Sequence, residues 1–192
     1  MEHVRISKQR QLITYSDFWN ASRFLFEQGQ TAQRGSYYQF LASLIFSAFT
    51  YEAFLNHVGE HLLECWPEVE RKLSPRAKLS LIAERLNIKV DYGRLPWQII
   101  PGLLGFRDKI AHGKNEMIRL EKTIPMDSKY EEVMHEFLFA DWQNFAIEKN
   151  VVRIRQHLED VLTTVHRAAN IKDDFLFRHG DQVRSASLVR RE

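Results

Sequence analysis

The chain contains very little cysteine, glycine and proline. Its 192 residues include one cysteine, 8 glycines and 5 prolines. A single cysteine excludes an intrachain disulfide and a cysteine-based zinc cluster, and the low glycine and proline content is unlike that of collagenous or disordered chains. Because 44% of the residues are hydrophobic and 27% are charged, we expect one folded domain in a reducing, cytoplasmic compartment.

Long apolar runs and nucleotide-binding motifs are also missing. The longest apolar stretch, residues 40–55, is shorter than a membrane span and contains Glu52. The first residues carry charges of both signs and have no continuous apolar region like that of a secretory signal. No Gly-rich phosphate loop, G-x-S-x-G elbow or dinucleotide fingerprint occurs. We therefore expect no membrane association, no cofactor and no metal.

Charge is unevenly distributed along a chain whose net charge is only +2. Residues 71–94 contain seven basic and two acidic side chains, whereas residues 127–148 contain one basic and six acidic side chains. Such asymmetry can steer a polyanion or pair two surfaces of a dimer. Solvated helix faces explain the same pattern without any ligand, and the sequence leaves these alternatives open.

Apolar residues recur at helical spacing through most of the chain. Ser16 is a candidate N-cap for a short first helix, Pro67 is expected to stop a long second helix, and Ser74 with Pro75 is typical of a helix start. The predicted helices cover residues 17–28, 36–65, 76–88, 97–112 and 148–170. The last helix should bury one side, made of Val152, Ile154, Leu158, Val161, Leu162 and Val165.

This pattern predicts an all-α protein, folded as an up-and-down helical bundle with an irregular insertion. Residues 1–15 form an N-terminal segment, residues 16–170 the single domain, and residues 171–192 a polar, basic tail that we expect to be disordered. The insertion begins after the helix that ends near His112, where Gly113 suits a left-handed C-terminal position. Within it, residues 116–129 should be extended, and residues 130–145 helical in part. The four tryptophans, at positions 19, 66, 97 and 142, are expected in the core.

The segment FRDKIAHGK, residues 106–114, resembles the signature of the HEPN superfamily. In that family four to six residues separate an arginine, usually followed by a polar residue, from a histidine near a helix end. Here these are Arg107, Asp108 and His112. Because 17 arginines and 8 histidines produce the bare spacing about once by chance, the resemblance depends on context: the apolar helix before the motif and the long acid-bearing helix LIFSAFTYEAFLN, residues 44–56.

The resemblance implies a metal-independent endoribonuclease of a toxin–antitoxin or phage-defence system. Its catalytic residues would be Arg107 and His112, in a composite cleft where two motif copies face each other in a homodimer. RNA would be the substrate, and a cognate antitoxin or a neighbouring defence protein a possible partner. Some members of the family have lost catalysis, so the alternative is a helical module that binds RNA or a protein without turnover.

The residue types themselves suit RNA cleavage. Attack by a 2′-hydroxyl needs one group to accept its proton, another to protonate the leaving oxygen, and positive charge beside the phosphorane. Histidine titrates near neutral pH and can serve either proton step, and arginine offers a permanently charged fork that matches phosphate oxygens. The alternative without catalysis is that His112 is a cation at a helix C-terminus and that Arg107 is a surface ion-pair partner.

Helix geometry separates the two motif residues. Positions five apart point about 140° away from each other, so Arg107 and His112 can converge through the reach of arginine, through distortion near Gly113, or through a second copy. Asp108 is four residues before His112 and is expected to fix its imidazole. Glu52 and Asn56, also four apart on the long helix, are the candidate supporting residues.

Two features depart from the family pattern. Asp108 replaces the asparagine most typical after the arginine, and its negative charge lies where RNA phosphate should approach. Some family members act with a nucleotidyltransferase that modifies a tyrosine two residues after the histidine, but Lys114 occupies that position here. The sequence therefore does not support that form of regulation.

A zinc site is the competing interpretation of another motif. The segment HVGEH, residues 57–61, matches the H-x-x-E-H pattern of inverted zinc peptidases, with His57 and His61 on one helix face and Glu60 as a possible base. The missing third ligand would have to come from Glu131, Glu132 or Glu136. A polar stripe at the end of a long helix is the simpler explanation.

Overall fold

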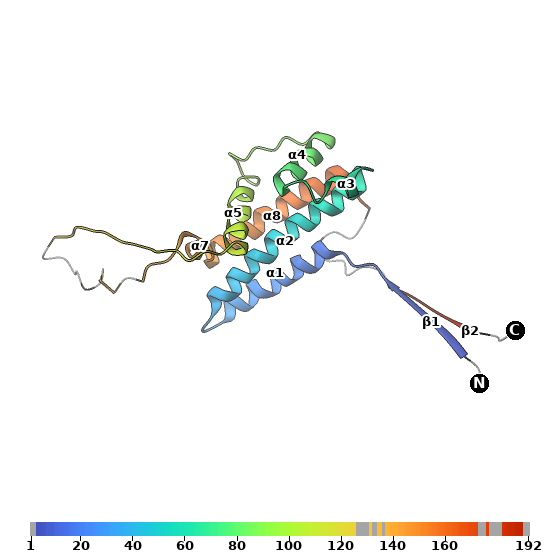
Figure 1. The fold of residues 1–192 in the computed structure, drawn as a ribbon, viewed down its shortest axis with the longest axis horizontal. Coiled ribbons are helices and arrows are strands. Elements are labelled where there is room, and N and C mark those ends of the chain that lie inside the picture. The colour runs from blue at the N-terminus through green and yellow to red at the C-terminus, as the bar shows by residue number, and fades with distance from the viewer. Residues whose placement is uncertain are drawn as a thin grey trace.

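The computed structural model describes residues 3–125, 131, 134, 135, 137–172, 176 and 182–189. This part of the chain is mostly helical and confirms the all-α prediction (Figure 1). It contains β1 (His3–Arg10), α1 (Thr14–Thr31), α2 (Ser36–Leu62), α3 (Trp66–Val69), α4 (Pro75–Arg85), α5 (Ile99–Ala111), α7 (Asp141–Phe145), α8 (Glu148–Ala169) and β2 (Gln182–Val189). None of these helices has the length and apolar character needed to cross a lipid bilayer.

The core lies between the three longest helices. α1 and α2 run side by side, joined by a turn that ends at Gly35, whose φ of 80° favours glycine. α8 packs against α2 (Figure 1). Leu44, Leu55 and Leu158 are fully buried in the shared core, and the shorter helices α4 and α5 also pack on α2. Trp19, Trp66 and Trp97 are buried as expected, and Trp142 packs against the core.

Several predicted helix ends needed correction. Ser16 is not the N-cap of α1, because the helix starts at Thr14 and the Ser16 hydroxyl donates to the carbonyl oxygen of Leu176, 2.6 Å away. Pro67 does not stop α2, which ends at Leu62, but lies in the first turn of α3, where its missing N–H is not needed. Ser74 does cap α4, accepting from the Ala77 N–H at 3.2 Å.

Two further corrections concern the C-terminal end of the motif helix α5 and the buried face of the last helix α8. Gly113 lacks the left-handed conformation; His112 is the C-cap of α5, with a φ of −104° and a ψ of 23°. Val152 is 43% exposed, and Val151 is buried in its place. The helix α8 starts at Glu148 as expected. Val151 faces the core because it lies three residues before the buried Ile154, and residues three apart share a helix face.

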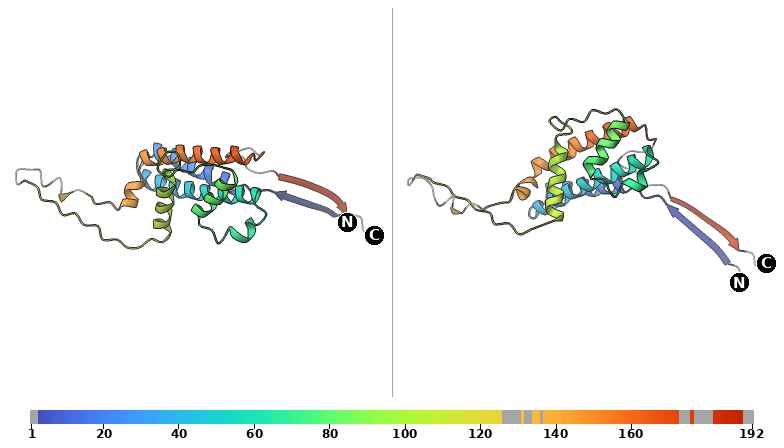
Figure 2. Two further views of the ribbon diagram at one scale, coloured as in Figure 1. Left: turned by 90° about the horizontal axis from the view of Figure 1, so that it is seen from above. Right: turned by 45° about the horizontal axis from the view of Figure 1, so that its top comes forward.

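The termini form an element that the sequence did not indicate. β1 and β2 pair as an antiparallel ribbon, with Arg10 opposite Gln182 and His3 opposite Val189. The ribbon projects away from the helices (Figure 2). The prediction of a disordered tail is therefore wrong for residues 182–189, because strand pairing across 172 residues of sequence supplies hydrogen bonds that no local pattern reveals.

The insertion after α5 agrees with its prediction where the structure describes it. Residues 113–125 form neither helix nor strand and leave the helical body as extended chain (Figure 2). α7, at residues 141–145, supplies the expected partial helix. The extended residues 126–129 of the prediction lie outside the described part of the chain.

A buried arginine joins α1, α2 and α8. Arg155 donates a hydrogen bond to the Ser22 hydroxyl, which also contacts the hydroxyls of Ser43 and Ser47. The guanidinium carbon lies 4.2 Å from the centroid of the Trp19 ring. Burial lowers the pKa of the guanidinium to about 10, because low-dielectric surroundings disfavour the charged form.

This cluster gives a stability prediction. Ser22→Ala removes the acceptor but leaves the buried charge, so the free energy of unfolding should fall by about 1–3 kcal/mol. Arg155→Met removes the charge at similar volume and should cost less, about 1 kcal/mol or under. Urea denaturation of both single variants and the double variant measures this, with a smaller Ser22→Ala cost expected in the Arg155→Met background. A larger loss for Arg155→Met would contradict the argument.

Candidate functional site

The motif helix α5 is fixed by its apolar side. Ile100, Leu103 and Phe106 are buried in the core, and the Phe106 ring stacks on Phe145 of α7 at a centroid distance of 5.2 Å. Residues four apart share a helix face, so burial at positions 99, 103 and 106 determines the direction of the neighbouring polar side chains. Arg107 and Asp108 follow immediately, at the border of this packed surface.

Arg107 is held between two carboxylates. Its guanidinium forms an ion pair and hydrogen bond with Glu52 of α2, and its Nη1 lies 2.6 Å from Oδ1 of Asp108. The Arg107 side chain is only 21% exposed, and its Nε is buried without a hydrogen-bond partner among the described residues. The arginine is therefore positioned by α2, and its positive charge is compensated locally.

His112 lies in a different environment, at the end of the same helix. Its backbone N–H donates to the carbonyl oxygen of Asp108 at 3.0 Å, and its side chain is exposed. It opens on a hollow at the start of the insertion. The hollow is lined by Gly105, Asp108, Lys109, His112, Lys114, Asn115 and Glu116.

The predicted pairing of Asp108 with the His112 imidazole is not present. Asp108 directs its carboxylate to Arg107 instead, although positions 108 and 112 share a helix face. An arginine with five donors and a permanent charge is the stronger partner for a carboxylate than an exposed imidazole. No other side chain in the described part of the chain fixes the His112 ring by a hydrogen bond.

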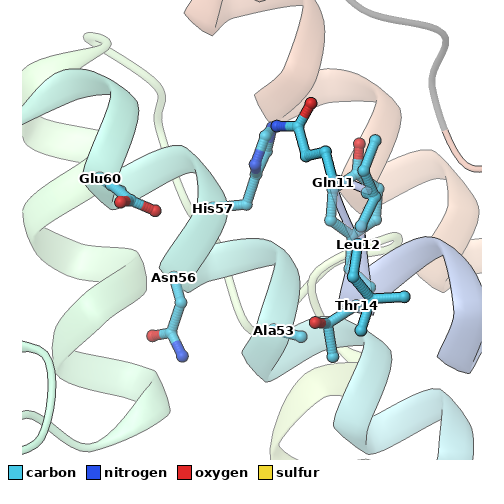
Figure 3. A pocket seen from close by; sticks show the side chains of 9 residues that line it. Gln11, Leu12, Thr14, Ala53, Asn56, His57 and Glu60 are labelled. Atoms are coloured by element: carbon cyan, nitrogen blue, oxygen red, sulfur yellow. The ribbon is translucent and has the colours of Figure 1, made fainter. Parts of the chain in front are cut away.

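The two supporting residues on α2 have different surroundings. Glu52, a candidate supporting residue from the sequence, contacts Arg107. Asn56, one turn further along, accepts a hydrogen bond from Nζ of Lys78 at 2.6 Å and lines a separate hollow at the start of α1. Figure 3 shows Asn56 in that hollow, with Gln11 and Thr14 across from it. The structure therefore keeps Glu52 at the motif and does not place Asn56 there.

The same hollow bears on the zinc interpretation. His57 and Glu60 line it (Figure 3). The His57 ring packs on Tyr15 at a centroid distance of 5.0 Å. His61 is exposed at the end of α2 and is not among the lining residues. Across the described residues, no three histidine, cysteine or acidic side chains gather as a metal site would need. Glu132 and Glu136 lie outside these residues.

Sequence reasoning missed two basic residues beside His112. Lys109 and Lys114 line its hollow, and Nζ of Lys109 forms an ion pair with Glu116 at 2.9 Å. Both flank the motif in the sequence, in DKIAHGK, so the available signal was the density of basic residues around the histidine. The hollow beside the exposed His112 therefore contains two lysines together with two carboxylates, those of Asp108 and Glu116.

The chain matches no protein-family model, no curated protein and no solved structure.

Proposed function

We propose that this protein is a metal-independent endoribonuclease of HEPN type, cleaving RNA as a homodimer. The observation that supports it best is a positioned arginine, Arg107 held by Glu52, on the same short helix as an exposed histidine, His112. The long helices α1, α2 and α8 would form the family's bundle, with the insertion following α5. A toxin–antitoxin or phage-defence role in the cytoplasm follows from the family resemblance, with an antitoxin or neighbouring defence protein as partner.

The proposed reaction is transfer of the phosphodiester to the adjacent 2′-hydroxyl. The 2′-oxygen forms a bond to phosphorus as the bond to the 5′-oxygen breaks, leaving a 2′,3′-cyclic phosphate and a 5′-hydroxyl. His112 accepts the 2′-hydroxyl proton or donates one to the leaving 5′-oxygen. Arg107 stabilises the negative charge that develops on the phosphorane oxygens. Water supplies no atom in this step.

A second copy of the motif completes the site in this proposal. Arg107 is directed to α2 while His112 is exposed at the helix end, which agrees with positions five apart on a regular helix. One copy therefore supplies a phosphate-binding group and a proton-transfer group in separate environments. Two copies related by a two-fold axis would supply two of each to one cleft.

The chemistry is tested by incubating the purified protein with RNA in excess EDTA. We expect cleavage to continue, with products that carry a 2′,3′-cyclic phosphate and a 5′-hydroxyl, because the proposed residues need no metal. Product ends are identified by mass spectrometry. Cleavage that stops in EDTA, or products with a 3′-hydroxyl, would exclude this mechanism.

Asp108→Asn should improve RNA binding. The substitution removes one negative charge next to Arg107 while Glu52 continues to hold the guanidinium. We expect the Kd for a non-cleavable 2′-O-methyl RNA to fall about threefold to tenfold, since unit charges about 4 Å apart near a surface interact by a few kcal/mol at most. Fluorescence anisotropy at fixed salt measures it.

The matched control is Asp91→Asn. Asp91 pairs with Arg94 at 3.6 Å on the loop before α5, so the same charge is removed beside another arginine. We expect little change in the Kd. Weaker binding by Asp108→Asn, or equal tightening by both variants, would show that Asp108 does not oppose phosphate at the motif.

A non-catalytic RNA- or protein-binding module is the second candidate function. The compensation of Arg107 by two carboxylates favours it, because a neutralised arginine attracts phosphate less strongly. In that case the wild-type protein leaves RNA intact on prolonged incubation, whether it binds RNA or a partner protein.

A further inference from the structure

The ribbon formed by β1 and β2 contains basic residues and no acidic ones. Its basic residues are Arg5, Lys8 and Arg10 in β1 and Arg184 in β2. These are four of the 27 lysines and arginines of the chain, and none of its 25 acidic residues lies in either strand, so the rest of the chain has a net charge of −2. The net positive charge of this protein therefore resides in the ribbon.

The strand register brings like charges together. Lys8 of β1 lies opposite Arg184 of β2, and Arg10 lies two residues beyond Lys8 on the same strand. Positions two apart on a strand are about 7 Å apart on one face, and directly opposite positions share a face as well. Three basic positions therefore lie together on one face of the ribbon, and Arg5 occupies a position on the other face.

This charge pattern opposes the pairing of the two strands. A two-stranded antiparallel pair is only marginally stable in water, and like charges directly opposite each other, as at Lys8 and Arg184, destabilise it further. Residues 6–10 are exposed, and the ribbon projects away from the helices, so the described helices leave this part of β1 uncovered (Figure 2). An anionic ligand along the ribbon would remove the repulsion.

We infer that the ribbon binds the phosphate backbone of a nucleic-acid strand, which the proposed function identifies as RNA. The centre of a protein–protein interface is enriched in aromatic residues and depleted of charge, whereas neither strand of the ribbon contains an aromatic residue. Nucleic-acid interfaces are polar and rich in positive charge. A second copy is the wrong partner, because two ribbons of like charge repel each other and lysines on a strand oppose edge-to-edge pairing.

The composition of the ribbon also predicts how it binds. Without aromatic residues it has no surface on which bases can stack, and phosphate contacts carry no sequence information. The ribbon leads into the start of α1, whereas the insertion that follows the motif leaves the helical body on the opposite side (Figure 2). The ribbon therefore holds RNA away from the scissile phosphate, and its loss should raise KM and leave kcat unchanged.

The test is the salt dependence of binding to a non-cleavable 2′-O-methyl RNA, measured by fluorescence anisotropy. Each cation on a single-strand phosphate adds about 0.7 to the slope of log Kd against log salt concentration. Arg5→Gln with Lys8→Gln should lower that slope by about 1.4. Between about 50 and 200 mM salt, the wild-type Kd should then rise about sevenfold more than the variant Kd. Unpairing of the strands does not explain this result, because Lys8→Gln relieves the repulsion with Arg184.

Arg85→Gln with Lys89→Gln is the matched control. Both residues are exposed and lie in the basic stretch 71–94, so one arginine and one lysine are removed from the competing basic region. This variant should have the wild-type slope, and so should Arg5→Lys with Lys8→Arg, which retains both charges. An equal loss of slope in the control, a loss in the charge-retaining variant, or an unchanged slope in the Arg5→Gln, Lys8→Gln variant overturns the inference.

Single-stranded DNA separates this inference from the proposed function, because DNA has phosphates but no 2′-hydroxyl. The Arg5→Gln, Lys8→Gln variant should lose the same slope with DNA as with RNA. A wild-type chain that binds both strands through the ribbon but never cleaves RNA supports the ribbon site and contradicts the ribonuclease. RNA cleavage with the same KM in wild type and variant contradicts the ribbon site and leaves the metal-independent chemistry in place. Loss of binding to phosphatidylserine vesicles alone would identify a lipid surface as the ligand and overturn the inference.

Discussion

His112→Ala is expected to lower the rate of RNA cleavage about one-hundredfold to ten-thousandfold, the usual contribution of a general acid or base. The effect should fall on kcat more than on KM, because the imidazole moves protons in the transition state and Arg107 and the lysines of the hollow remain to bind phosphate. His112 is exposed and C-terminal in α5, so the variant should unfold at nearly the wild-type temperature. Initial rates on a fluorescent RNA oligonucleotide measure the change.

His61→Ala is the matched control for that experiment. His61 is also exposed and near the end of a helix, α2, and it belongs to the H-x-x-E-H segment. We expect wild-type rates, whereas a zinc site built on this segment predicts loss of activity. Equal rates for wild type and His112→Ala would remove His112 from the mechanism, and loss in His61→Ala alone would favour the zinc interpretation.

Gly59→Ala is expected to have the largest effect on stability. Gly59 lies in α2 against the indole of Trp66, and an added Cβ would come 2.3 Å from ring carbons Cε2 and Cζ2. Trp66 is only 1% exposed, so the ring has no free space into which to move. Overpacking of a filled core typically costs about 1–3 kcal/mol and sometimes more, and we expect the upper end, about 3 kcal/mol. Urea denaturation measures the loss.

Gly105→Ala provides the opposite case on α5. An added Cβ at this position meets no heavy atom within 4 Å among the described residues, and the backbone is ordinary helix. Alanine should raise the free energy of unfolding by about 0.5–1 kcal/mol, because it restricts the unfolded chain and suits a helix. Destabilisation by both substitutions to a similar extent would show that contact with Trp66 does not determine the Gly59 result.

Local patterns were sufficient for most helices of this protein. Apolar spacing predicted α2, α4, α5 and α8 to within a few residues, because burial on one side of a helix imposes a period of 3.6 on the sequence itself. The Ser74 cap was equally readable, since its acceptor and donor lie three residues apart. The predicted helix ends were less accurate where a residue distant in the sequence makes a contact, as at Ser16, whose hydroxyl donates to the carbonyl oxygen of Leu176.

The site was predictable as a set of residue types and much less as a set of contacts. The motif indicated Arg107 and His112, and the acid-bearing helix indicated Glu52. Asn56 lies four residues after Glu52 and therefore on the same helix face, but its side chain accepts a hydrogen bond from Lys78 of α4. The family resemblance and the ribonuclease activity stay predictions, which the cleavage assay tests.

By itself, the sequence determined the helical class, the positions of the main helices and the chemistry available at α5, because these depend on residues within a few turns of each other. Only the tertiary structure decided that Glu52 meets Arg107, that Asp108 binds the arginine and not the histidine, and that the two ends of the chain pair as a ribbon. Each of these contacts depends on how separate elements pack or on which of several possible partners a side chain binds. Sequence spacing does not determine either of these.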